Sequence, residues 1–150
     1  MMKTQPDWHN LAASSEYQTA IIIQKLLQEK KWMEADQGLG VLIESMGKSK
    51  KLALKSQLIR LMSHVIKWKC QPERRSSSWA VTILSARNEI EDIQEEIPSL
   101  NRNYLESVWE QSFNKAVKQA EIEMNKKCDL TLLSWEEVFE QEYTLLNPNE

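Results

Sequence analysis

The sequence has little glycine or proline, with three glycines and four prolines in 150 residues. Tight turns between β-strands rely on these residues, so their scarcity disfavours turn-rich β structure. No segment alternates strictly between apolar β-formers and polar residues, which is the pattern of a half-buried strand. The sequence therefore predicts an all-α protein, an irregular bundle of about six helices with no β-sheet.

Long apolar runs are also missing. No run approaches the roughly 18 apolar residues that a membrane-spanning helix needs, and the first six residues lack the apolar stretch of a secretory signal. We therefore expect a cytoplasmic protein with no membrane partner. Cys70 and Cys128 are expected to be reduced and buried in that compartment, so we predict no disulfide.

Residues that hold metals or act as nucleophiles are few. His9, His64, Cys70 and Cys128 are the only histidines and cysteines, and no two have the spacing of a zinc site. There is no G-x-S-x-G motif, and the Gly-Leu-Gly stretch at 38–40 lacks the rest of a phosphate-binding fingerprint. We predict neither a metal nor a cofactor.

Charge is distributed unevenly along the chain. The net charge is −3, but residues 48–75 carry +8, residues 1–47 carry −2 and residues 76–150 carry −9. The basic segment has the single acid Glu73. A basic surface of this density is typical of nucleic-acid binding, whereas the acidic segment that follows offers internal partners for the same charges.

Apolar periodicity and capping residues define the expected helices. They cover residues 15–30, 32–46, 49–70, 79–97 with a cap among the serines at 76–78, 101–126 and 135–142. We expect a break near Gly38, a left-handed cap at Gly47 and a helix end before Pro72. Residues 1–14 are expected to be a flexible segment, residues 15–146 a single helical domain and residues 147–150 a polar tail.

Two of the expected helices have apolar faces that suggest a position in the core. The third has a wide apolar face that includes Leu54, Leu58 and Leu61. In the fourth, apolar residues from Trp79 to Ile97 are spaced by 4, 3, 4, 3 and 4 residues, which is the spacing of a coiled-coil seam. Exposed residues of that seam are the predicted contact with a protein partner.

The segment from His64 to Trp79 concentrates basic, hydroxyl and aromatic residues. We call residues 60–79 the basic corner. Trp68, Trp79 and Pro72 are expected to form its structural core. Arginines bind phosphate bidentately and serine amides at a helix N-terminus add donors, so an anion or nucleic-acid site is one interpretation. Its candidate residues are Arg60, Lys67, Lys69, Arg74, Arg75, Ser76 and Ser78. The alternative, which we favour, is that Arg74 and Arg75 pair with acids of the C-terminal half.

A weak catalytic hypothesis centres on His64. Glu44 and His64 could act as general acid and base beside Arg74 as an anion clamp. The sequence R-L-M-S-H places Arg60 one helical turn before His64, but its three-residue gap is shorter than the four to six residues of some helical ribonucleases. We favour a structural histidine, bonded to a backbone carbonyl or to Glu44, over a catalytic one.

The pattern of the basic corner resembles a known family. The residues L-I-x-L-x-x-H-x-I-K-W-x-x-Q-P-E-R-R-S-x-S-W-x-x-T-I, together with I-E-S-M-G at 43–47 and P-S-L at 98–100, are similar to the bacterial domain-of-unknown-function family 29. The resemblance implies a small helical protein and assigns no activity, substrate or cofactor. The chain departs from the family at residues 38–42, where relatives usually have an asparagine and paired glutamates, and at its C-terminal end.

Three functions follow in order of preference. The first is a non-enzymatic interaction module that docks a protein partner or a second copy of itself. The second is a protein that binds nucleic acid or phosphate through the basic corner. The third is a hydrolase-type enzyme centred on His64.

Overall fold

A computed structural model describes residues 6–146 and confirms the all-α prediction. The helices are α1 (Trp8–Ser14), α2 (Glu16–Gln28), α3 (Trp32–Cys70), α4 (Ser77–Glu96), α5 (Arg102–Ser107) and α6 (Trp109–Met124), with a 3-10 turn at Pro72–Arg74 and a π-helical segment at Glu136–Glu140. The described residues include no strand. The chain divides into two compact units, Met1–Lys51 and Leu52–Glu150. A single domain over residues 15–146 stays a prediction.

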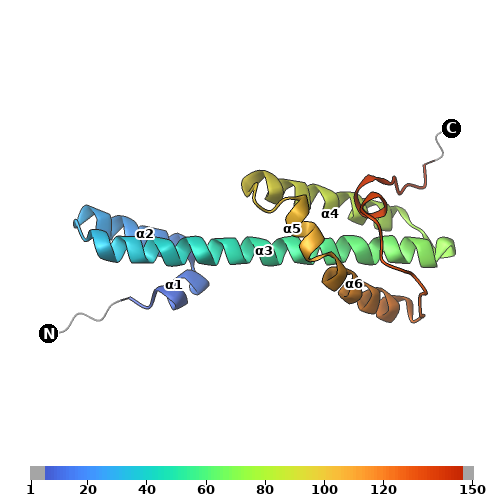
Figure 1. Cartoon of the computed structure of the whole chain (residues 1–150), viewed down its shortest axis with the longest axis horizontal. Helices are drawn as coiled ribbons and strands as arrows, with labels where there is room; N and C mark the ends of the chain where they lie inside the picture. Colours follow the sequence, from blue (N-terminus) through green and yellow to red (C-terminus); the bar gives the residue numbers. More distant parts are fainter. Residues whose placement is uncertain (1–5, 147–150) are drawn as a thin grey trace. The chain divides into compact units, whose positions relative to one another are not determined.

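The first unit is built from α1, α2 and the first part of α3 (Figure 1). Ser15 joins α1 to α2: its backbone amide donates to the Leu11 carbonyl at the end of α1, and its hydroxyl caps α2 by accepting a hydrogen bond from the Gln18 amide at 3.1 Å. Lys30, with φ of 61°, turns the chain from α2 into α3. A small apolar core forms around Trp8, Ile23, Leu26, Ala35 and Leu42.

The helix α3 is continuous over 39 residues, so the expected break near Gly38 and the expected cap at Gly47 are wrong. No glycine of the described chain has a positive φ, and Gly47 therefore lies in a helical turn. Gly38 has a packing role: a Cβ there would lie 2.5 Å from a ring carbon of Trp8. Because Gly38 has no side chain, the indole of Trp8 can lie directly on α3. A scale of helix propensities does not include such a contact.

Residues 8–14 form α1, although we expected residues 1–14 to be a flexible segment. The Asp7 side chain caps this helix at the Asn10 amide, and the buried Trp8 and Ala12 fix it to the first unit. Residues 1–5 and the predicted polar tail at 147–150 lie outside the described residues.

The second unit surrounds the C-terminal part of α3. As predicted, α3 contributes a wide buried face, with Leu54, Leu58, Leu61, Met62 and Ile66 each fully buried. Figure 1 shows α4 and α6 beside this part of α3. The rest of the core comes from α4, α5, α6 and the segments that follow α4 and α6: Ile83, Ala86, Ile90, Leu100, Leu105, Trp109, Phe113, Ala116, Ala120, Met124, Leu133, Val138 and Tyr143.

The C-terminal part of the second unit is less regular than expected. The helix predicted over residues 101–126 is interrupted at Val108, whose ψ of 6° separates α5 from α6. Asn125, with φ of 53°, ends α6 in the left-handed conformation. The predicted last helix is the π-helical segment, and Arg87 of α4 holds its end by donating to the backbone carbonyls of Val138 and Gln141.

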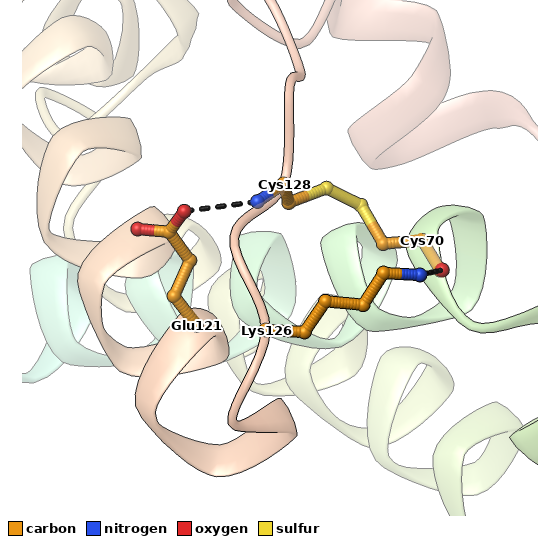
Figure 2. Close-up of a disulfide and its surroundings, with 4 residues drawn as sticks. All are labelled: Cys70, Glu121, Lys126 and Cys128. Carbon is orange, nitrogen blue, oxygen red and sulfur yellow. Dashed lines mark hydrogen bonds between the residues drawn. A yellow bond between two sulfur atoms is a disulfide. The ribbon is translucent and has the colours of Figure 1, made fainter.

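A disulfide joins Cys70 to Cys128, so the prediction of two reduced cysteines is wrong. Cys70 is the last residue of α3, and Cys128 lies in the loop after α6, with 6.3 Å between their Cα atoms (Figure 2). That separation lies within the range of bonded pairs. The loop is also held by the Glu121 carboxylate, which accepts from the Cys128 amide, and by Lys126, which donates to the Cys70 carbonyl.

Among residues 6–146, no helix combines the length with the apolar character that crossing a bilayer requires.

Candidate functional site

Lysines, not arginines, connect the basic corner to the acidic C-terminal half. Lys67 is buried and donates to the Glu123 carboxylate of α6 at 2.6 Å. Its ammonium also lies over the Trp79 ring, 5.3 Å from the centroid. Lys69 pairs with Glu137 of the π-helical segment at 2.7 Å. These donated hydrogen bonds lower the pKa of both glutamates. Two lysines of the basic corner, two residues apart on α3, therefore form ion pairs with acids of the C-terminal half.

The two arginines predicted to pair with acids are exposed. The Arg75 guanidinium lies over the Trp68 ring at 5.1 Å, and its Nε donates to the Trp68 carbonyl at 2.8 Å. Trp68 in turn packs edge-on against Tyr143 with 5.7 Å between centroids. Arg75 thus covers the end of α3 by stacking on a buried indole, and Arg74 lies beside it on the surface. Burial raises the pKa of Tyr143 to about 12.

The remaining residues of the predicted anion site are arranged as follows. Pro72 starts the 3-10 turn that separates α3 from α4, and Ser76 caps α4 by accepting from the Trp79 amide at 3.2 Å. Ser78 is exposed in the first turn of α4. Arg60 is half-buried and donates to Gln57 at 3.2 Å. The Ser76 hydroxyl oxygen therefore serves the helix itself, and an anion-binding role for the corner stays a prediction.

His64 makes the contact with a backbone carbonyl that we expected of a structural histidine. Its Nδ1 lies 2.9 Å from the Arg60 carbonyl, which can only accept, so Nδ1 carries the proton. The other ring nitrogen, Nε2, then faces the Lys67 ammonium at 3.5 Å as an acceptor. Burial, followed by the nearby charge of Lys67, lowers the pKa of His64. The neutral imidazole is thus part of a chain from the α3 backbone through Lys67 to Glu123.

The other members of the catalytic hypothesis lie elsewhere. Glu44 is exposed in the first unit, and Arg74 is exposed at the end of the 3-10 turn. His64 instead contacts the Arg60 carbonyl and Lys67. Within residues 6–146, no three His, Cys, Asp or Glu side chains are grouped so that they could hold a metal ion.

The seam on α4 packs mainly against the core of the second unit. Ile83, Ala86 and Ile90 are at most 2% exposed, and Trp79, Ile93 and Ile97 pack against the same core. Most of the seam is therefore used within the second unit, and a partner contact through its partly buried residues stays a prediction. Its 4-3-4-3-4 spacing reflects packing within the second unit, because a core helix and a coiled-coil helix share this periodicity.

The first part of α3 has an apolar face that is partly exposed, and our sequence reasoning missed it. Trp32 is 59% exposed and Ile43 is 61% exposed, and Leu39 and Met46 are also on the surface. We call these four residues the α3 stripe. Trp32, Leu39 and Met46 recur every seven residues, with Ile43 between the last two. That spacing is a readable signal, but we had divided this helix at its glycines.

A second missed feature lies on the second unit. A pocket of about 340 Å³ lies along α4 and the C-terminal segment, and another of about 320 Å³ is lined by Glu106, Trp109, Glu110, Leu132 and Trp135. The second pocket combines two carboxylates with two indoles. Its residues span positions 106 to 135 of the sequence, so the fold is needed to bring them together.

Comparison with known proteins agrees with the resemblance in the basic corner. No curated protein and no solved structure matches the chain. A family model described as "Domain of unknown function DUF29" matches residues 16–145, which is nearly the whole chain and spans both units. The protein therefore belongs to the DUF29 family.

Proposed function

We propose that this protein is a non-enzymatic interaction module that pairs with a second copy of itself through the α3 stripe. The observation that carries the proposal is an exposed tryptophan followed by three exposed aliphatic residues along one face of a single helix. Soluble proteins seldom leave such residues clustered in water, and contiguous apolar patches mark interaction sites.

The spacing of the stripe favours a helix as the docking element. Residues spaced by seven, or by four and then three, lie on the same side of a long helix. A partner helix can then insert its own side chains between them along several turns. Tryptophan and methionine are also enriched at the centres of protein interfaces. A second α3 presents the same face, so one surface satisfies both partners, as two-fold dimers require.

Charge along α3 favours antiparallel pairing. Asp36 lies seven residues before Ile43 of the stripe, and Lys50 lies seven residues after it. Antiparallel helices would place the acidic end of one copy near the basic end of the other. Parallel helices would bring like charges together, which costs free energy and opposes the helix dipoles.

Light scattering on a size-exclusion column tests self-association through the stripe. The wild-type mass should rise with concentration towards twice the 17.6-kDa chain mass. Ile43→Glu would bury unpaired carboxylates at the contact and should weaken the dimer at least about 100-fold, which corresponds to about 3 kcal/mol. Ile122→Glu is the matched control, because Ile122 is 79% exposed on α6 and should leave the mass unchanged. A wild-type chain that stays at 17.6 kDa, or equal masses for both variants, contradicts the proposal.

A charge exchange tests the antiparallel orientation. Asp36→Lys should weaken the dimer, because the new lysine would face the basic end of the other copy. Adding Lys50→Glu should restore it, since the two ends are then exchanged together. In a parallel dimer each residue would face the same residue of the other copy, so both variants would keep like charges opposite each other at both ends and no recovery would occur.

Nucleic-acid binding is the second candidate function, and the exposure of Arg74 and Arg75 supports it. Against it, Lys67 and Lys69 already pair with acids of the same chain. Fluorescence anisotropy with a labelled oligonucleotide at two salt concentrations provides the test. Phosphate contacts should weaken steeply with salt and be lost in the Arg74→Ala/Arg75→Ala variant, and no binding at low salt would exclude this function.

The cytoplasmic location stays a prediction, which fluorescence microscopy of the tagged chain in its native cell would test.

A further inference from the structure

The pocket between α5, α6 and the following segment has the composition of a site for an organic cation. Its volume is about 320 Å³, near the lower end for small-molecule sites. It is lined by two carboxylate side chains, two indoles and one leucine: Glu106, Glu110, Trp109, Trp135 and Leu132. This feature lies in the second unit and is independent of the α3 stripe.

The aromatic wall is held in place by contacts of its own. The Trp109 Nε1 donates to the Leu133 carbonyl at 2.8 Å, which fixes the orientation of this buried indole. The Trp135 ring stacks on it with 5.5 Å between centroids, and Phe139 packs against Trp135 at 4.3 Å. The ring faces are therefore ordered before any ligand arrives, which lowers the entropic cost of binding.

The chain already places one of its own cations on this cluster. The Arg102 guanidinium lies 4.3 Å from the Trp135 ring centroid, and its Nε donates to Glu106 at 2.9 Å. One arginine thus combines a ring face with a carboxylate, which is the arrangement that binds ammonium and guanidinium groups in proteins. The lining of the pocket also includes Trp109, which is 8% exposed, and the exposed Glu110.

Glu110 is the carboxylate that remains for a ligand. It is exposed at the start of α6, and no ion pair involves it within residues 6–146. Glu106 lies four residues earlier and is paired with Arg102. Residues 76–150 also carry a net charge of −9, so the surrounding field attracts cations and repels anions.

We propose that this pocket binds a methylated ammonium group, with its methyl groups against the indole and leucine surfaces that line the pocket and its charge beside Glu110. The volume suits a headgroup of a few heavy atoms, and the apolar Leu132 and indole surfaces suit its methyl groups. A free quaternary amine and a trimethylated lysine side chain carry the same headgroup. The two sources differ in whether neighbouring peptide groups add affinity.

Nuclear magnetic resonance of the intact chain with ¹⁵N-labelled indoles tests the proposal. Choline should shift the Trp109 and Trp135 indole signals and saturate with a Kd on the order of millimolar, as expected for one small cation at a partly exposed site. Its neutral isostere 3,3-dimethylbutan-1-ol should bind at least about five-fold more weakly. A trimethyl-lysine peptide that binds more tightly than choline indicates a peptide source, whereas equal affinity indicates the free amine.

Two matched variants separate the pocket from general electrostatics. Glu110→Gln should weaken choline binding about five- to ten-fold and leave the spectrum of the rest of the chain unchanged. Glu91→Gln removes the same charge from an exposed position on α4 and should have no effect on binding. Equal binding of choline and its isostere, equal effects of the two variants, or the absence of indole shifts would overturn the proposal.

Discussion

Three glycines on one helix provide a sharp test of how the first unit is built. Gly38, Gly40 and Gly47 all lie within α3, but their surroundings differ. A Cβ at Gly38 would lie 2.5 to 2.8 Å from three ring carbons of Trp8, whereas a Cβ at Gly40 or Gly47 meets nothing within 4 Å. The same change, glycine to alanine, should therefore have opposite effects at these positions.

The expected magnitudes follow from two terms. Alanine in place of glycine inside a helix stabilises it by about 1 kcal/mol, and this term applies at all three sites. At Gly38 the added methyl also displaces a buried indole, and overpacking of this kind costs about 1–3 kcal/mol. Gly40→Ala and Gly47→Ala should each stabilise the first unit by about 1 kcal/mol. Gly38→Ala should destabilise it by about 1 kcal/mol, leaving a gap of about 2 kcal/mol.

Urea unfolding followed by circular dichroism measures these differences, and amide exchange in residues 8–14 reports whether α1 detaches. In a Trp8→Ala background the clash is absent, so Gly38→Ala should become stabilising, like Gly40→Ala. A destabilising Gly47→Ala would refute the continuous helix, because it would indicate a left-handed cap at that position. A stabilising Gly38→Ala in the wild-type background would refute the contact between α1 and α3.

Three further predictions concern the second unit. Cys128→Ser removes the link to Cys70, whose separation of 58 residues implies a loss of about 4 kcal/mol in the loop-closure view, measured as a lower urea midpoint. Glu123→Gln leaves the Lys67 ammonium buried without its anion and should cost about 1 kcal/mol near neutral pH, because the glutamate itself is partly exposed. The stabilisation from this pair is fully present above the ordinary glutamate pKa and is lost as pH falls through the lowered pKa of Glu123. The free energies of unfolding of wild type and variant should therefore converge in acid. The pKa of His64 is also lowered in the folded chain, so as pH falls below about 6.5 the imidazole of the unfolded chain binds a proton before that of the folded chain. The free energy of unfolding of the wild type should therefore decrease in this range. His64→Gln has no imidazole at this position and should lose less stability over the same range.

The second unit could be predicted in outline because its helices obey simple periodic rules. The buried face of α3, the end of α4 before Pro98 and the cap at Ser76 all follow from residues close together in sequence. The break at Val108 and the π-helical segment do not, because packing against residues far along the chain determines them.

The candidate sites were harder to predict, for the same reason. The composition of the basic corner suggested either an anion site or internal pairing. Which cations pair depends on how α3 lies against α6 and the π-helical segment, and this register places Lys67 and Lys69, not Arg74 and Arg75, beside carboxylates. The disulfide likewise depends on a spatial approach that two isolated cysteines do not reveal.

The α3 stripe illustrates a different difficulty. Its seven-residue spacing was present in the sequence, but helix propensity at the glycines suggested two short helices instead of one long one. Propensity is a weak guide where tertiary contacts decide, as the contact between Trp8 and Gly38 shows. Burial then separates the exposed stripe from the neighbouring core face that includes Ala35 and Leu42.

Pulsed electron paramagnetic resonance between two copies tests the antiparallel pairing of α3 most directly. Spin labels at Gln37 and Ser49, both exposed, lie equally far from Ile43 on either side. Labels at residue 37 of one copy and residue 49 of the other should be about 9 Å apart at the backbone, which is one helix–helix separation. Two labels at residue 37 should be about 20 Å apart, since 12 residues of helix add about 18 Å along the axis. The reverse order of these distances, or no dipolar signal between copies, would contradict the account.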